Sequence, residues 1–134
     1  MARSYLLDTS ILSHLVRQPH GPVAARIAEV GEDNVLTSVI VACELRYGAA
    51  KRGSRRLTRQ VEMVLGAMTI LAFEVGVDRH YAAIRTALEK KGTQIGAHDM
   101  LIAAHARAID AVCVTANVAE FKRVPALRVE NWLA

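Results

Sequence analysis

With 134 residues and a net charge of +4, the chain has the size of one domain, so we expect residues 1–134 to fold as a single unit. Hydrophobic residues make up 52% of the chain but aromatic residues only 4%, which favours a compact α/β core over a surface of stacking aromatics. No run approaches the roughly 18 apolar residues of a membrane span, and the short apolar run before Asp8 predicts no ordinary signal peptide.

Strand-like and helix-like patterns alternate along the chain. In chain order they predict a strand at 3–7, helices at 10–17 and 22–30, a strand at 35–37, helices at about 38–50 and 57–68, a strand at 69–72, helices at 78–91 and 97–108, a strand at 111–115, a helical turn at 117–121 and an edge strand at 127–129. Strands that alternate with helices predict a parallel sheet covered by helices on both faces. The fold class is therefore α/β.

Three acidic residues stand in apolar or small-residue surroundings: Asp8, Glu44 and Asp99. Asp8 directly follows the first strand, where an open α/β sheet binds its ligands, although an Asp before a helix is also a good N-cap. Buried carboxylates are costly without a partner, and no Lys or Arg is among the closest sequence neighbours of Asp8 or Asp99. We therefore expect a cation from solution to pair with them.

Oxygen ligands favour Mg²⁺ or Mn²⁺ over zinc. Hard cations held by carboxylates beside a basic surface are typical of phosphodiester hydrolysis. Thr115 and Asn117 follow the fourth predicted strand, so they are expected at the same sheet edge as Asp8. His98 and His105 lie seven residues apart, which leaves open a metal-binding pair or ordinary polar contacts.

A short basic stretch offers a surface for an anionic partner. It is either a phosphate-binding surface or a solvated helix end. Its members are Lys51, Arg52, Arg55, Arg56 and Arg59.

Four segments together make the chain resemble the PIN-domain ribonucleases, and among them the VapC-type toxins of bacterial toxin–antitoxin pairs. They are residues 5–12, 44–49, 99–106 and 115–132, and they span nearly the whole chain in the family's order. The resemblance implies a three-layer α/β/α fold with a short central parallel sheet. It also implies a metal-dependent endoribonuclease with Asp8, Glu44 and Asp99 as metal-binding acids.

The chain departs from the family at two positions. Ser10 stands where the family usually has Asn, but a hydroxyl can still orient a water at the metal, and Thr9 lies beside it. Ala116 stands where a polar residue is common. If the site has a fourth carboxylate, it must be Glu120, the only acid between Thr115 and Val129; otherwise Glu120 is an exposed partner of Lys122 or Arg123.

The resemblance further implies partners and a location. We expect a cytoplasmic homodimer that is held inactive by a small VapB-type antitoxin, and transfer RNA is one substrate suggested by similar toxins. The apolar stripes that include Leu12, Leu15, Val16 and Ile27 are predicted to form part of a groove for an amphipathic antitoxin segment. Cys43 and Cys113 are expected to be small buried hydrophobic residues.

Other functions fit the sequence less well. A haloacid-dehalogenase-like phosphatase needs a second acid two residues after Asp8, where this chain has Ser10, and a receiver module needs an Asp after its third strand, where this chain has Ala72-Phe73-Glu74. The remaining alternative is a catalytically inactive PIN-like module that only binds RNA or a partner. Retention of all three central acids argues against it.

Overall fold

A computed structural model describes residues 3–133 and places one parallel sheet at the centre of the molecule. The strand order is β3-β2-β1-β4-β5, and every neighbouring pair runs parallel. The strands are β1 (Tyr5–Leu7), β2 (Val35–Ser38), β3 (Thr69–Leu71), β4 (Val112–Val114) and β5 (Val129–Glu130).

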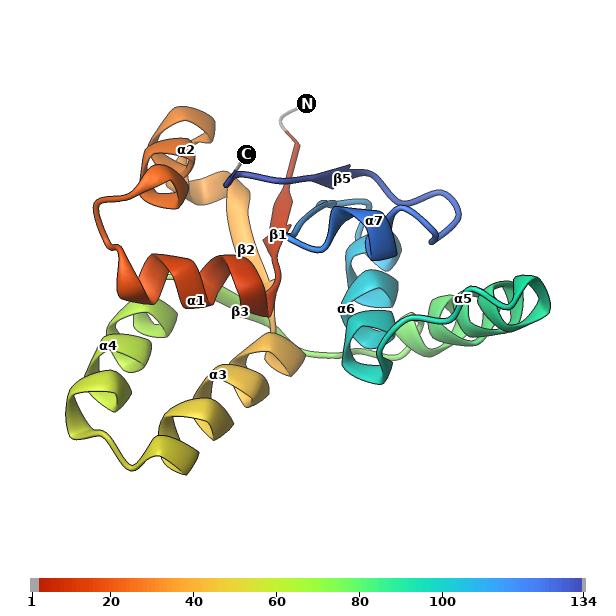
Figure 1. Cartoon of the computed structure of the whole chain (residues 1–134). Coiled ribbons are helices and arrows are strands. Elements are labelled where there is room, and N and C mark those ends of the chain that lie inside the picture. Colours follow the sequence, from red (N-terminus) through yellow and green to blue (C-terminus); the bar gives the residue numbers. More distant parts are fainter. Residues whose placement is uncertain (1–2, 134) are drawn as a thin grey trace.

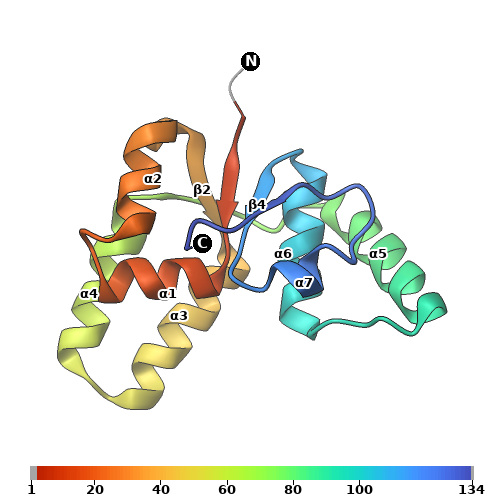
Figure 2. The ribbon, with the colours of Figure 1, turned by 45° about the horizontal axis from the view of Figure 1, so that its top comes forward.

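Helices cover the sheet on both sides, as the sequence predicts (Figure 1). In Figures 1 and 2, α1, α2 and α4 lie on one side of β1, and α5 and α6 lie on the other. The helices are α1 (Thr9–Arg17), α2 (Pro22–Val30), α3 (Val39–Arg52), α4 (Arg55–Gly66), α5 (Val77–Lys91), α6 (Ala97–Ala108) and the short α7 (Val118–Phe121), with a 3-10 turn η1 (Glu32–Asn34) before β2.

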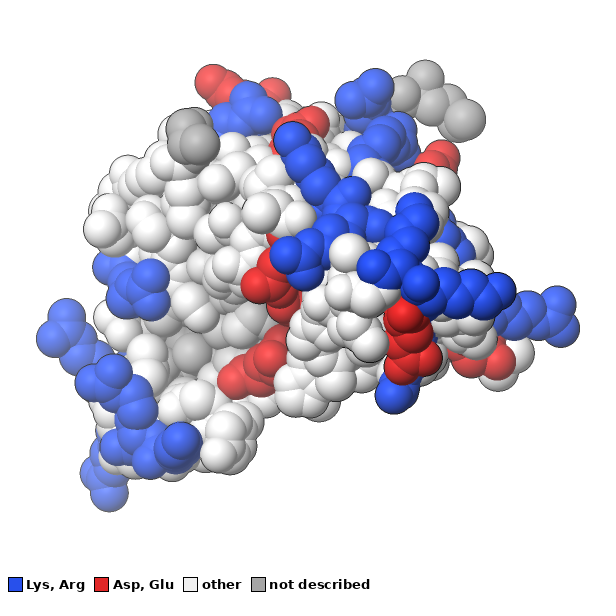
Figure 3. Space-filling view, turned by 45° about the vertical axis from the view of Figure 1, so that its right-hand side comes forward, with Lys and Arg blue, Asp and Glu red and all other residues white. Residues whose placement is uncertain are grey.

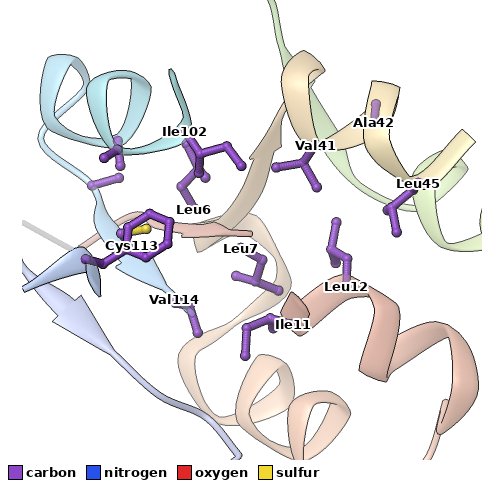
Figure 4. Close-up of a cluster of buried hydrophobic side chains, with 14 of the residues drawn as sticks. Leu6, Leu7, Ile11, Leu12, Val41, Ala42, Leu45, Ile102, Cys113 and Val114 are labelled. Carbon is purple, nitrogen blue, oxygen red and sulfur yellow. The ribbon is translucent and has the colours of Figure 1, made fainter. Parts of the chain in front are cut away.

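The core is built around β1 because side chains alternate across a strand and β1 is covered on both faces. Leu6 and Leu7 are both fully buried. In Figure 4, Leu6 lies beside Ile102 of α6, whereas Leu7 points toward Ile11 of α1. A continuous apolar run is thus what a central parallel strand requires, and it stops where Asp8 begins.

The strand order reverses at β1. The chain runs from β1 to β2 and β3 on one side and then crosses to β4 on the other side of β1. Asp8 N–H donates to the Val114 carbonyl (3.0 Å) and continues the β1–β4 pairing to the strand ends. Open α/β sheets bind ligands at such a reversal point, beyond the carboxyl ends of the strands.

Side-chain caps set where three helices begin. Asp8 accepts from Ile11 N–H, Ser38 from Ile40 N–H and Ser54 from Leu57 N–H, so α1, α3 and α4 start one residue after each cap. α3 continues to Arg52, slightly beyond its predicted end, and Gly53 (φ 64°) then lets the chain turn. The predicted edge strand lies slightly later, at Val129–Glu130.

The structure contradicts the expected burial of Cys43 and removes two residues from the predicted partner groove. Cys43 is exposed, because it projects from the outer side of α3, whereas Cys113 is buried in β4 as expected. Leu12 and Val16 belong to the closed core and are only 0% and 4% exposed, so they offer no surface to a partner. No helix within residues 3–133 combines the length and apolar character of a membrane crossing.

Candidate active site

Asp8 lies at the end of β1, and its side chain is only 2% exposed. Its Oδ1 accepts hydrogen bonds from Ser10 Oγ (2.6 Å) and from the Ile11 N–H (3.0 Å), so the residue is also the N-cap of α1. Burial raises the pKa of Asp8, although hydrogen bonds from Ser10, Thr115 and the backbone oppose the rise. The N-cap interpretation of Asp8 is therefore confirmed, and a role of the same buried carboxylate in binding a cation stays a prediction.

Ser10 links the ends of the two central strands. Its Oγ donates to Asp8 and accepts from the Ala116 N–H (3.1 Å). The hydroxyl at this position therefore fixes the Asp8 carboxylate and also holds the chain beyond β4 against α1.

Glu44 comes from the middle of α3, and its carboxylate is 26% exposed. Thr9 Oγ1 donates a short hydrogen bond (2.5 Å) to Oε1, and Nδ1 of His98 lies 3.1 Å from Oε2. A carboxylate accepts only, so His98 Nδ1 carries the proton in this contact. Side chains from α1 and α6 thus hold both oxygens of Glu44.

Asp99 lies in the first turn of α6, three residues after the N-cap Gly96. Burial raises its pKa from 3.8 to about 6, and the negative charges of Asp8, Glu120 and Glu44 contribute to this rise in that order. Three acids that are distant in sequence therefore act on Asp99 at the carboxyl edge of the sheet.

The segment after β4 brings the remaining predicted residues to the same edge. Thr115 is fully buried, and its Oγ1 accepts from the Asn117 N–H (2.9 Å). Asn117 is exposed and leads into α7, but its side chain makes no capping bond. Glu120 lies in α7 and is partly exposed, near enough for its charge to raise the pKa of Asp99.

The donor set fits a hard divalent cation. Asp8, Glu44 and Glu120 repel the Asp99 carboxylate at this edge, and buried Asp8 forms no ion pair with a Lys or Arg within residues 3–133. A cation relieves this repulsion, and the oxygen donors suit Mg²⁺ or Mn²⁺. As the side chains stand, however, no three His, Cys, Asp or Glu residues in the described part of the chain are grouped closely enough to hold a metal ion together.

The two histidines of α6 do not form a pair. His98 is 67% exposed and contacts Glu44, whereas His105 is buried, with Nδ1 2.7 Å from Ser38 Oγ and its ring edge against Phe73. Burial lowers the pKa of His105 and so favours its neutral form. The polar-contact interpretation is therefore confirmed for both residues.

A groove of about 520 Å³ leads away from the acids between α1, α3 and α4. Thr9 and Glu44 line its inner end, and Arg52 and Arg56 line its outer end. The sequence analysis did not predict the residues in the middle of this groove. The sequence does carry a signal for them, since lining residues recur every four positions along a helix. These series are Thr9, Ser13 and Arg17 on α1, and Glu44, Gly48 and Arg52 on α3.

The basic stretch forms the corner between α3 and α4. Lys51 and Arg52 end α3, and Arg55, Arg56 and Arg59 begin α4. All five are exposed, and none forms an ion pair within the described residues. A second hollow of about 430 Å³, lined by Arg55 and Arg59, shares Ala49 and Ser54 with the groove. We call these five cations the α3–α4 cluster.

Comparisons with known proteins give consistent relatives. The family model described as PIN domain matches residues 5–127. The chain is 35% identical to Ribonuclease VapC2 of Rickettsia felis, covering 96% of this chain and 97% of that one. It is 31% identical to the tRNA(fMet)-specific endonuclease VapC of Salmonella typhimurium, with coverage of 96% and 97%.

Solved structures agree with these relatives. The crystal structure of VapBC2 from Rickettsia felis bound to a DNA fragment from its promoter matches with a TM-score of 0.88 at 35% identity, covering 96% of this chain and 98% of that one. DNA-bound VapBC from Salmonella typhimurium also gives a TM-score of 0.88, at 31% identity, with coverage of 97% and 98%.

Proposed function

Because this chain belongs to the PIN-domain family, alongside the VapC ribonucleases, we propose that it is a Mg²⁺- or Mn²⁺-dependent endoribonuclease that hydrolyses phosphodiester bonds in RNA. The observation that carries the proposal is the continuous groove from Glu44 to the exposed cations of the α3–α4 cluster. Such a groove binds a phosphate backbone at one end and brings it to the acids at the other.

Each residue at the sheet edge has a distinct part. Asp8, Glu44, Asp99 and Glu120 would hold the metal ion, which when bound lowers the pKa of water and neutralises charge on the phosphate. Ser10 fixes the Asp8 carboxylate, and Thr9 fixes that of Glu44. Thr115 holds the turn that leads to α7 through its bond with the Asn117 N–H.

A cleavage assay with purified protein tests this function. We expect RNA cleavage with Mg²⁺ or Mn²⁺, none with a chelator, and product ends that carry a 5′-phosphate. Asp8→Asn keeps the shape and removes the charge, and it should reduce the rate by on the order of 10²-fold or more. RNA binding without any metal-dependent cleavage would instead support the inactive binding module.

We infer that transfer RNA is the substrate class, because one relative at 31% identity is named a tRNA(fMet)-specific endonuclease. Sequencing RNA ends after brief induction of the protein in cells tests this choice. New ends confined to one transfer RNA support it, and new ends spread over messenger RNA contradict it.

We further propose that a VapB-type antitoxin inhibits the enzyme, since structural relatives are VapBC complexes. A hollow of about 320 Å³ between α1, α2 and α4 suits an amphipathic segment of such a partner. Leu15 and Ile27 line it, as predicted, together with Met63, which is 75% exposed.

We also propose that the chain forms a homodimer. The large side chain of Tyr47 on α3 is 66% exposed, and a second copy would cover it. The cytoplasm is the location that fits a protein with two free cysteines.

A further inference from the structure

A second group of unpaired cations lies on the other side of the acids from the groove. Lys90 and Lys91 end α5, and Lys122 and Arg123 follow α7. All four are exposed, and none forms an ion pair within residues 3–133, whereas Arg26, Arg46, Arg85 and Arg128 each contact a carboxylate. We call these four cations the α5–α7 patch.

The chain itself ties this patch to the acids. Arg123 Nη1 donates to the Gln94 carbonyl (3.2 Å). Gln94 lies in the loop that joins α5 to α6, and Asp99 lies in the first turn of α6. Lys122 is two residues after Glu120, whose charge acts on Asp99. The patch therefore borders the acids through α6 and α7, whereas the groove approaches them through α1 and α3.

Figure 3 shows the charges of this face directly. Lys and Arg side chains gather in two groups, one at the lower left and a larger one at the upper right, with acidic side chains between them. The α3–α4 corner is at the lower left of Figure 1, while the ends of α5 and α7 are on its right. Cations on both sides of the acids can attract a polyanion that crosses the acids from one group to the other.

We propose that the α5–α7 patch binds the RNA backbone on the side of the cut opposite the α3–α4 cluster, so that one RNA strand spans both. This inference rests on the proposed function for its substrate class. Unpaired exposed cations attract phosphates because no protein carboxylate neutralises them. Two separated contacts on one strand reinforce each other only when the strand is long enough to reach both.

The affinity of the full chain for fluorescent single-stranded RNA tests this proposal. It is measured in the presence of a chelator, so that the RNA is not cleaved. We compare the wild type with Lys90→Gln/Lys91→Gln/Lys122→Gln, which leaves the Arg123 bond to Gln94 intact. On a long RNA, the log–log salt slope should flatten by about 0.7 for each phosphate that the variant no longer binds. On an RNA too short to span both sites, the same variant should lose little affinity, because the α3–α4 cluster alone binds it. The control, Arg85→Gln/Arg128→Gln, removes two cations that each already contact a carboxylate, and it should bind both RNAs like the wild type.

Crosslinking then tests the placement. RNA with 4-thiouridine near one end should crosslink to the peptide that contains Lys122, and RNA labelled near the other end should crosslink to the peptide that contains Arg56. Crosslinks from both ends to one peptide, or an unchanged salt slope in the triple variant, would overturn the proposal. So would a triple variant that binds RNA normally but loses an acidic protein partner.

Failure of the proposed function looks different. If the wild type binds RNA across both groups of cations but does not cleave it with any divalent metal, the enzyme assignment fails and the patch stands. If the wild type cleaves RNA and the triple variant binds the long RNA normally, only the patch is wrong.

Discussion

His98 and Glu44 are 54 positions apart in sequence, yet Nδ1 of His98 lies 3.1 Å from Oε2 of Glu44. With Thr9 on the other oxygen, the Glu44 carboxylate is held from two helices. His98 is 67% exposed, so the contact adds little to folding stability. Its effect is to orient the Glu44 carboxylate.

His98→Ala should therefore weaken Mn²⁺ binding by about 10-fold, the lower end of effects for residues that position a metal ligand. His98→Asn, which retains a donor in place of Nδ1, should restore most of the affinity. Calorimetric titration of the metal-free protein with Mn²⁺ measures both variants. In a Glu44→Gln background the His98→Ala change should have no further effect, and an additive loss there would show that His98 does not act through Glu44.

Asp99→Asn should raise the melting temperature of the metal-free protein at about pH 8, and less at about pH 4. The pKa of Asp99 is raised from 3.8 to about 6 in the folded chain. Its contribution to stability is therefore complete below the unfolded pKa and is lost as the pH rises through about 6. Scanning calorimetry at the two pH values measures the difference.

Asp78 is the matched control for this sign. Its pKa is lowered, mainly by the hydrogen bond from the Gly76 N–H, so its carboxylate favours the folded state above the unfolded pKa. Asp78→Asn should lower the melting temperature at about pH 8, the opposite of Asp99→Asn. If both variants shift it in the same direction, burial and the neighbouring negative charges do not destabilise the Asp99 carboxylate in the folded chain.

Glu120→Gln separates a ligand from a surface residue. In the structure Glu120 forms no ion pair with Lys122 or Arg123, both within the described residues, and its charge raises the pKa of Asp99. If Glu120 is a metal ligand, the variant should need more Mn²⁺ than the wild type for half-maximal cleavage. Its melting temperature without metal should stay unchanged or rise. Superimposable curves of cleavage rate against Mn²⁺ concentration would remove Glu120 from the site.

The α3–α4 cluster should contribute to RNA affinity through phosphate contacts. Changing Arg55, Arg56 and Arg59 together to Ala should weaken binding at low salt and flatten the log–log salt slope by about 0.7 for each phosphate that is no longer bound. Arg46→Ala is a control from the same two-helix unit, because Arg46 is already paired with Glu62 of α4. An unchanged slope in the triple variant would leave the cluster as a solvated helix end.

Met63→Glu should weaken antitoxin binding by introducing a charge into the apolar hollow between α1, α2 and α4. RNA cleavage by the free variant should remain at the wild-type rate, because the hollow shares no lining residue with the groove. Pull-down with the cognate antitoxin and a cleavage assay give the two measurements. Met63→Leu, which keeps the hollow apolar, is the control, and full antitoxin binding by Met63→Glu would place the partner elsewhere.

The sequence alone determined the alternation of strands and helices and the edge at which the acids meet. An apolar run that ends at Asp8 marks a buried strand, and parallel connections bring the ends of all strands to one edge. That rule also placed Thr115 beside Asp8, since Leu7 pairs with Val114. These features follow from local periodicity and from the few topologies open to such a pattern.

Only the tertiary structure decided which side chains hold the acids and where the grooves lie. The contacts of Glu44 with Thr9 and His98 span 35 and 54 positions, and they depend on how α1, α3 and α6 approach one another at the end of the sheet. The exposure of Cys43 and the burial of Leu12 likewise depend on which face of each helix packs inward. Local patterns specify a helix and its apolar side, but the angle and distance between two helices are set by the packing of side chains that meet only in the folded chain.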